Sequence, residues 1–221
     1  MRMLFHSGYC TAVSNEGSGD ISLILPNKEV RQAFRDEIGR WEEQLHNSRL
    51  ANSLLETALG GNIEEFKASF INAIESSVSM YDIAGRNEQS YHVLSLGFFI
   101  AGVRRGYQIH SNKEAGYGRY DIAIFPAQPN AGSRAVILEF KVFQRHFKKG
   151  NRAVIEEKLQ KLAREGLSQI DNQRYHLSVP AWCTELIEYG VSFYKTHCVM
   201  LSRQRRRPVE NSNWEVVSSD F

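Results

Sequence analysis

The run AVILEFKVF at residues 135–143 carries two charged residues, Glu139 and Lys141, among large apolar ones. So many apolar side chains indicate a strand in the middle of a sheet. Residues two apart on a strand project to the same face, so the carboxylate and the ammonium group are expected side by side. Burying either charge alone is costly, whereas a metal ion or a phosphate nearby offsets the cost. Taken alone, the pair is more often found on an amphipathic strand with both charges in water.

A third charge, Asp121, interrupts the preceding apolar run RYDIAIFP. The loop AQPNAGS between the two runs predicts a hairpin, which would bring Asp121 to the same face as Glu139. Two carboxylates so close repel each other unless a cation lies between them, and an all-oxygen pocket suits Mg²⁺ or Mn²⁺. Lys141 can orient a metal-bound water or stabilise the charge that develops on a phosphate. The three residues therefore predict metal-assisted hydrolysis of phosphodiester bonds.

The elements that must position these residues follow from hydrophobic periodicity and turn residues. A helix with the apolar middle VLSLGFFIAGV is expected to be buried, and three strands, a long helix, a short helix after Pro180 and a final strand follow it. Asn27 can cap a helix near the N-terminus, and Asn62 with Glu65 resembles a capping box. The expected strands cover residues 9–13, 21–25, 107–111, 119–125, 134–143 and 191–202, and the expected helices cover residues 27–46, 49–59, 62–78, 88–105 and 152–173.

The segment SNKEAGYGRYDIAIFP, followed by AVILEFKVF, resembles the signature of PD-(D/E)XK nucleases. More narrowly, residues 60–201 resemble the nuclease-like domain found behind an AAA-type ATPase. The resemblance implies an α/β, restriction-endonuclease-like core of helix, three strands, helix and strand, with a mixed sheet flanked by helices and an N-terminal mainly helical extension. It places a linker similar to the ATPase-side junction at residues 1–46 and the nuclease-like domain at residues 47–221. Tyr120 stands where the superfamily name implies a proline, which is often missing there.

The resemblance assigns roles to individual residues. Asp121 and Glu139 would bind the metal ion, and Lys141 would be the catalytic lysine. Such nucleases often add an acidic residue from the first core helix, and Glu88 is the candidate. A carboxylate in the first turn of a helix, favoured by the helix dipole, would explain Glu88 equally well.

Two further candidates have equally simple alternative explanations. Glu114 could supply a metal ligand, or it could form an ion pair with Arg119. Gln169, with Tyr175 nearby, matches a glutamine common on the helix after the E-x-K strand, or it is a polar helix residue without a role. His92, on the apolar helix, is more simply explained as a satisfied core residue than as a ligand.

Positive charge gathers around and after the E-x-K segment. Residues 134–164 carry nine Lys or Arg and three Asp or Glu, which suits a polyanion but also a solvated helix face. The run RQRRRP at residues 203–208 is expected to be disordered and solvated. The candidates for contacting nucleic acid are Arg119, Arg145, Lys148, Lys149 and Arg152, with His146 beside them. For all of these except Arg119, a solvated loop is the alternative explanation.

Composition narrows the class of protein. The chain is 42% hydrophobic and 24% charged, which is ordinary for a globular protein, and no apolar stretch approaches the ~20 residues that a membrane helix needs. With no cleavable signal pattern, we expect a soluble cytoplasmic protein. The three scattered cysteines favour neither zinc nor disulfides.

The sequence thus predicts a Mg²⁺- or Mn²⁺-dependent nuclease that acts on nucleic acid, DNA being favoured over RNA. The chain has no Gly-Lys dipeptide and therefore no P-loop of its own. The competing hypothesis is a catalytically silent module that binds nucleic acid or protein and works with a separate AAA-type ATPase.

Overall fold

The computed structural model describes residues 11–14, 21–24, 49–60, 62–77, 88–99, 106–144, 152–208 and 213–220. The chain divides into two compact units, Met1–Asn47 and Ser48–Phe221. In the first unit, β1 (Thr11–Ser14) and β2 (Ile21–Ile24) pair in antiparallel fashion, as the two expected strand segments predict. The helix expected at residues 27–46 lies outside the described residues.

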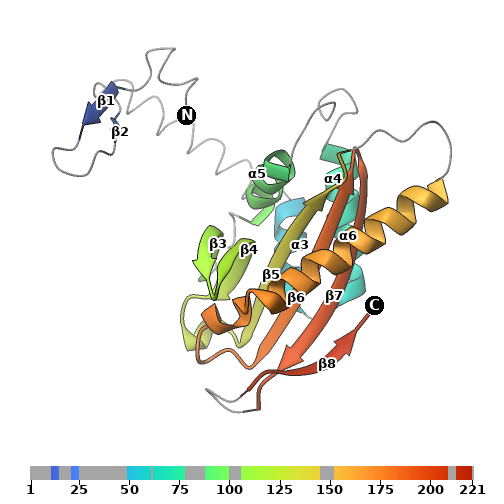
Figure 1. The fold of residues 1–221 in the computed structure, drawn as a ribbon. Helices are drawn as coiled ribbons and strands as arrows, with labels where there is room; N and C mark the ends of the chain where they lie inside the picture. The colour runs from blue at the N-terminus through green and yellow to red at the C-terminus, as the bar shows by residue number, and fades with distance from the viewer. Residues whose placement is uncertain are drawn as a thin grey trace. The chain divides into compact units, whose positions relative to one another are not determined.

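The second unit is built around a six-stranded mixed sheet in the order β3-β4-β5-β6-β7-β8 (Figure 1). Its strands pair in antiparallel fashion except for β5 and β6, which are parallel and joined through α6. The strands are β3 (Tyr107–Ala115), β4 (Gly118–Pro126), β5 (Arg134–Val142), β6 (Glu185–Tyr194), β7 (His197–Arg206) and β8 (Glu215–Ser219). The helices are α3 (Arg49–Gly60), α4 (Ile63–Ser77), α5 (Glu88–Phe99) and α6 (Arg152–Asn172), with short 3-10 turns η2 (Pro129–Ala131) and η3 (Tyr175–Ser178).

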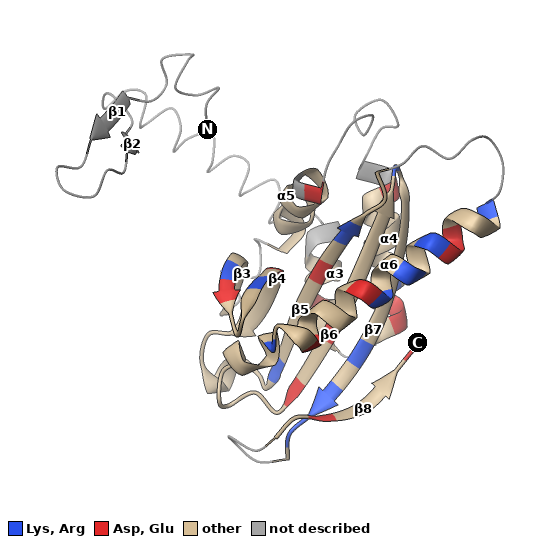
Figure 2. Ribbon diagram, in the orientation of Figure 1, with Lys and Arg blue, Asp and Glu red and all other residues tan. Residues whose placement is uncertain are grey.

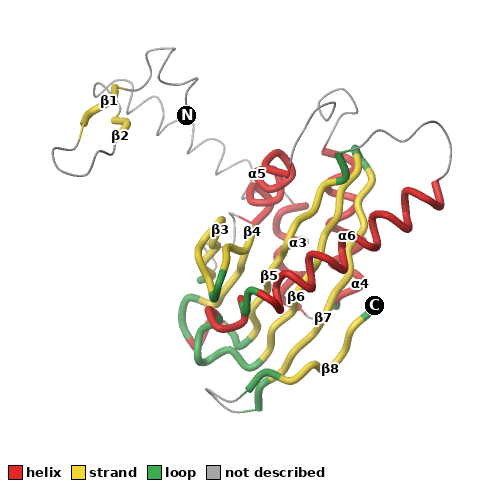
Figure 3. Tube along the Cα trace, viewed as in Figure 1, coloured by secondary structure: helices red, strands yellow, loops and turns green. Residues whose placement is uncertain are grey.

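Helices cover both faces of this sheet, with α6 on one face and α3 and α4 on the other (Figures 1 and 3). The alternation along β5 shows the two layers. Val136, Leu138 and Phe140 pack with the α3–α5 core, whereas Ala135 and Ile137 pack with Leu167 and Ile170 of α6. Because both faces of β5 are buried, its sequence is an almost continuous apolar run. The restriction-endonuclease-like α/β architecture expected from the sequence is confirmed.

The N-terminus of α4 is capped as the sequence predicts. The Asn62 Oδ1 accepts a hydrogen bond from the Glu65 N–H at 3.2 Å, and the Asn62 amide donates to the Glu65 carboxylate at 3.0 Å. The expected helices at 49–59 and 152–173 are also confirmed, to within a residue at each end.

Two expectations about the last third of the chain are wrong. The single strand expected at residues 191–202 is two strands, β6 and β7, with a turn at Lys195, which adopts a left-handed φ of 54°. That turn contains none of the Gly, Pro, Asn or Asp residues that usually mark one. The short helix expected after Pro180 is instead η3, which ends before Pro180.

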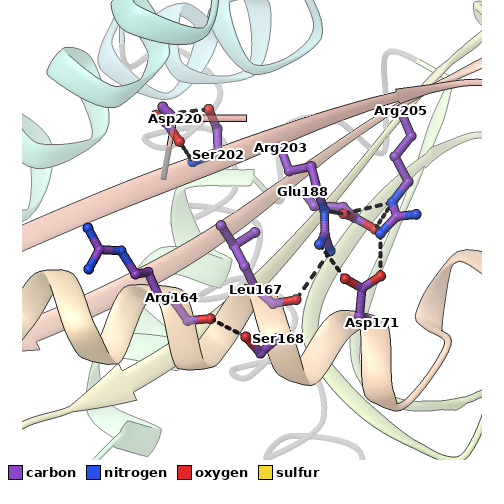
Figure 4. Close-up of polar contacts among 9 residues, drawn as sticks. All are labelled: Arg164, Leu167, Ser168, Asp171, Glu188, Ser202, Arg203, Arg205 and Asp220. Atoms are coloured by element: carbon purple, nitrogen blue, oxygen red, sulfur yellow. Dashed lines mark hydrogen bonds and ion pairs between the residues drawn. The ribbon is translucent and has the colours of Figure 1, made fainter. Parts of the chain in front are cut away.

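The arginine run expected to be disordered forms the end of β7 and the residues just after it, and Arg203, Arg205 and Arg207 are buried. Figure 4 shows Arg203 and Arg205 with their partners. Arg203 and Arg205 both bind the buried Glu188 of β6 and the Asp171 carboxylate of α6. Arg207 donates to backbone carbonyls, including that of Ala181 at 2.9 Å. Figure 2 shows basic and acidic positions on the strands that α6 crosses and on α6 itself. Buried charges need such partners, and here the partners are far away in sequence.

The close packing of α6 on the sheet depends on two glycines. A Cβ added at Gly190 of β6 would overlap the Ala163 carbonyl of α6, and one added at Gly166 would lie 3.3 Å from the Glu139 carbonyl oxygen. The backbone of α6 therefore lies directly against the β5–β6 pair at the level of Glu139.

We expect Gly190→Ala to lower the free energy of unfolding by about 1–3 kcal/mol, because α6 must move away from β6 to admit the methyl group. Gly97→Ala is the matched control, since a Cβ there meets nothing within 4 Å, and it should be neutral or stabilise α5 by up to about 1 kcal/mol. Urea unfolding measures both changes. Equal effects of the two substitutions would contradict the packing argument.

We expect Glu188→Ala to lower the free energy of unfolding by about 3–5 kcal/mol, because it leaves Arg203 and Arg205 buried with half their countercharge. Glu64→Ala removes an exposed partner of Lys67 and should change stability by no more than about 1 kcal/mol. Thermal and urea unfolding of both variants test this difference. A Glu188 variant as stable as the wild type would show that the network is not structural.

Candidate active site

The main-chain pairing between β4 and β5 ends next to Asp121. Paired residues run from Ile124 and Val136 to Ile122 and Leu138, and the next position on β4 is Asp121. There the Asp121 carboxylate, rather than the main chain, accepts the Phe140 N–H at 2.7 Å. The side chain thus takes the place of a ladder hydrogen bond and is fixed against β5.

Glu139 lies on the α6 face of β5 and is only 2% exposed. Its Oε1 accepts a hydrogen bond from the Lys141 ammonium group at 3.0 Å, and that group also donates to the Phe140 carbonyl at 2.9 Å. Its Oε2 is buried and has no hydrogen-bond partner among the residues that the structure describes. A buried carboxylate oxygen left without a donor is uncommon, because the desolvation penalty is then not offset.

The two carboxylates share one face of the sheet. Continuing the register of Ile122 with Leu138 sets Asp121 opposite Glu139, and residues opposite each other in an antiparallel pair point the same way. The electrostatics agree with this placement, because Asp121 and Lys141 both act on the ionisation of Glu139. The structure therefore brings Asp121, Glu139 and Lys141 together, as their spacing predicts.

The site raises the pKa values of its acids. The pKa of Glu139 is raised to about 8, mainly by burial and also by the Asp121 and Glu88 charges, while Lys141 opposes the shift. Burial also raises the pKa of Asp121, against the Phe140 N–H and Lys141. Strongly shifted carboxylates in one place are a common mark of functional sites.

Glu88, at the first position of α5, lies at the edge of this group. Its side chain is exposed to solvent, yet desolvation raises its pKa, Lys141 lowers it and Asp121 raises it. These interactions place Glu88 within electrostatic range of Asp121 and Lys141. They give it an environment that a simple first-turn carboxylate would not have.

Gln169 and Tyr175 form a second polar group beside the carboxylates. The Gln169 amide donates to the Tyr175 hydroxyl at 3.2 Å, and this hydroxyl donates to the Arg119 carbonyl. The pKa of Tyr175 is raised by burial, and the charges of Glu139 and Asp121 add to the shift. The sequence indicated Tyr175 only as a neighbour of Gln169, whereas the structure connects it to the backbone two residues before Asp121.

His92 of α5 is buried and fully bonded, as the sequence analysis expects of a core histidine. Its Nε2 lies 3.0 Å from the Asp121 carbonyl and 3.1 Å from the Ser111 hydroxyl, and its Nδ1 lies 3.3 Å from the Asn112 amide nitrogen. Asn112 has a left-handed φ of 49° and interrupts the β3–β4 ladder opposite Asp121. His92 therefore holds the backbone of the residue that carries the Asp121 carboxylate, a role that the sequence alone did not indicate.

The remaining predicted residues lie apart from this group or outside the described residues. Glu114 forms an exposed ion pair with Arg119 at 3.3 Å, which is the simpler of its two predicted roles. Arg152 is exposed at the first position of α6. Arg145, Lys148 and Lys149, with His146, fall outside the residues that the structure describes.

The donor set fits a hard divalent cation. It offers carboxylate oxygens from two adjacent strands, one of them without a hydrogen-bond partner, and Mg²⁺ usually binds through one or two carboxylates and several waters. Within the described part of the chain, no group of three or more His, Cys, Asp or Glu side chains is arranged to hold a metal ion. Nor does that part contain a helix long and apolar enough to span a membrane.

A mixed sheet flanked by helices, with two carboxylates and a lysine at the point where the pairing of two central strands ends, defines a restriction-endonuclease-like domain. A sequence model of the PD-(D/E)XK nuclease superfamily matches residues 86–203, more than half of the chain. The chain belongs to this superfamily. No curated protein matches it. The matched segment contains every residue of the site described above.

In buffer free of divalent cations, we expect Glu139→Gln to become more stable relative to the wild type as the pH rises from 5 to 8. Between the ordinary pKa of 4.5 and the raised value of about 8, the unfolded chain loses the Glu139 proton while the folded chain keeps it. Wild-type stability should therefore fall with rising pH, by up to about 1.4 kcal/mol per unit. Urea unfolding across this range measures the difference, and parallel curves for the two proteins would contradict it.

Proposed function

We propose that this protein is a Mg²⁺-dependent nuclease that hydrolyses phosphodiester bonds, in DNA rather than RNA, with Asp121 and Glu139 binding the metal ion. The observation that carries the proposal is the unpartnered, buried Oε2 of Glu139 beside a second carboxylate. Mn²⁺, with the same preference for oxygen ligands, is expected to substitute.

A comparison within the same sheet supports a functional role for Glu139. Glu188 is also buried, but both of its oxygens accept hydrogen bonds from arginines. Glu139 has Lys141 on one oxygen, and the other oxygen has no hydrogen-bond partner among the described residues. A carboxylate with a purely structural role is expected to have partners on both oxygens, as Glu188 does. A carboxylate that binds a cation is expected to keep one oxygen available, as Glu139 does.

A bound Mg²⁺ would lower the pKa of a coordinated water and neutralise charge on the phosphate. Lys141 is held by the Glu139 Oε1 and the Phe140 carbonyl, so its ammonium group has a fixed position beside the proposed metal ligands. From there it orients the attacking water or stabilises the charge that develops on the phosphate. A neutral side chain in place of Lys141 would not supply this positive charge.

Three groups assist in this proposal. Glu88 adds a third carboxylate near Asp121 and Lys141, suited to a water-mediated contact with the metal or to proton transfer. Gln169 orients the Tyr175 hydroxyl, and the charges of Glu139 and Asp121 act on the pKa of this hydroxyl. The exposed Arg119 and Arg152 offer cations for the flanking phosphates, with Arg145, Lys148 and Lys149 as further candidates by sequence.

We expect Glu139→Gln, Asp121→Asn and Lys141→Met each to reduce cleavage of DNA by at least about 100-fold in Mg²⁺. Lys161→Ala, an exposed lysine of α6, is the control for Lys141 and should retain full activity. Initial rates on single-stranded, duplex and branched DNA, in Mg²⁺ or Mn²⁺ and with EDTA, provide the measurement. Near-ultraviolet circular dichroism verifies the fold of each variant.

Wild-type protein that cuts none of these DNA substrates, nor RNA, in either metal would overturn the proposal. If such a protein still bound nucleic acid in a salt-dependent manner, the silent module working with a separate AAA-type ATPase would replace it. Co-purification with such an ATPase would then identify the partner.

A further inference from the structure

The tip of the β3–β4 hairpin presents Tyr117 to solvent. Its side chain is 73% exposed, and it is the one aromatic residue among the large exposed hydrophobic residues of the described chain. An exposed aromatic ring loses the stabilisation that burial of its area would give. The described residues around it show that this exposure is built into the fold.

The backbone on both sides of Tyr117 is fixed against the end of α6. The Tyr117 N–H donates to the Gln173 carbonyl at 2.9 Å. Gly116 has a φ of 55°, and a Cβ there would overlap the Gln173 carbonyl, while one at Gly118 would lie 3.0 Å from the Gln173 side-chain oxygen. Glycines at both positions thus allow the tip to dock, and the docked tip holds the tyrosine outward.

A cation lies over this ring, and further basic residues lie on the two strands of the hairpin. The Arg174 guanidinium lies 5.4 Å from the centre of the Tyr117 ring, and Arg174 itself holds a left-handed φ of 54°. Arg119 follows on β4, and Lys113 lies on β3. The carboxylate that lines the adjacent hollow, Glu114, pairs with Arg119, but both side chains are mostly exposed, so a phosphate can replace this weak interaction.

A hollow of about 360 Å³ opens beside the ring, lined by Glu114 and residues 116–119. An aromatic ring, a neighbouring hollow and the guanidinium groups of Arg174 and Arg119 match the base and the phosphates of a nucleic-acid strand. Stacking on the ring needs a free base face, which the interior of a duplex does not offer.

The hairpin tip is also connected to the site. Tyr117 precedes Asp121 by four residues, which is at most about 13 Å along a strand. The Tyr175 hydroxyl holds the intervening Arg119 carbonyl. With about 3.4 Å per stacked nucleotide, a strand whose phosphate lies at the carboxylates reaches Tyr117 within about four nucleotides.

We propose that Tyr117, flanked by Arg174 and Arg119, is a stacking platform for an unpaired base, and that the substrate is single-stranded DNA or DNA with an unpaired end. The assignment of this surface to the substrate path rests on the proposed nuclease function. The binding of single-stranded DNA at the hairpin tip does not require cleavage and is testable without it.

The test measures binding of the full-length protein in EDTA to a fluorescent oligo(dT) strand and to a blunt duplex, by anisotropy. We expect Tyr117→Ala to weaken oligo(dT) binding at least about fivefold and duplex binding less than twofold, because only the single strand offers a free base face. Tyr117→Phe and Tyr117→Trp, which keep a stacking ring, should bind oligo(dT) within about twofold of the wild type. Val216→Ala removes an exposed side chain from β8, at the opposite edge of the sheet, and should bind as the wild type does.

The charged flank has its own readout. Arg174→Ala should reduce the slope of log Kd against log salt concentration by about 0.7, as expected for one phosphate contact on a single strand.

Equal binding by Tyr117→Ala and Tyr117→Phe, an equal loss for both DNA forms, or no binding of oligo(dT) by the wild type would each overturn the platform. Binding that depends on Tyr117 in a protein that never cleaves would support the platform while refuting the nuclease. If Tyr117→Ala changed neither cleavage nor oligo(dT) binding, the nuclease function would be supported and the platform refuted.

Discussion

The desolvation of the Glu139 carboxylate by the backbone of α6 is the constraint on which the site depends. Gly166 and Gly190 let the helix lie against β5 and β6, and at this level the helix excludes water from the carboxylate. This burial is the main cause of the raised pKa of Glu139, and no donor among the described residues reaches its Oε2. A compact cation offsets that desolvation better than a flexible lysine does, because it interacts with oxygens from more than one side chain.

The end of main-chain pairing between two central strands frees one carboxylate for such a site. The β4–β5 ladder stops at Ile122, and Asp121 turns its carboxylate to the Phe140 N–H instead of extending the main-chain ladder. His92 and Tyr175 bind the carbonyls of Asp121 and Arg119 from opposite faces of the sheet, where ladder partners are missing. Side-chain hydrogen bonds therefore hold the β4 backbone in place where its pairing with β5 ends.

Buried charge is handled in two ways on the α6 face. Arg203, Arg205, Glu188 and Asp171 neutralise one another through many hydrogen bonds, and this network joins β6 and β7 to α6. Close by, Asp121 of β4 and Glu139 of β5 bring two carboxyl groups to the single ammonium group of Lys141, and their hydrogen bonding within the described residues is incomplete. The first arrangement stabilises the fold, and the second makes sense as a binding site, so the difference in completeness separates structural from functional charge.

The sequence by itself determined the pieces whose signals are local. The apolar runs predicted β4 and β5, the two-residue spacing set Glu139 and Lys141 on one face, and the Asn62 cap predicted the start of α4, because each depends on neighbours within a few residues. Which buried charges are satisfied depends on how distant segments pack together. The arginines of β7 resemble a solvated run until Glu188 and Asp171, 15 to 34 residues away, are brought to them. Likewise His92, the docked tip at Tyr117 and the orphaned Glu139 oxygen depend on contacts between distant segments, and desolvation is a property of the packed chain that no local pattern encodes.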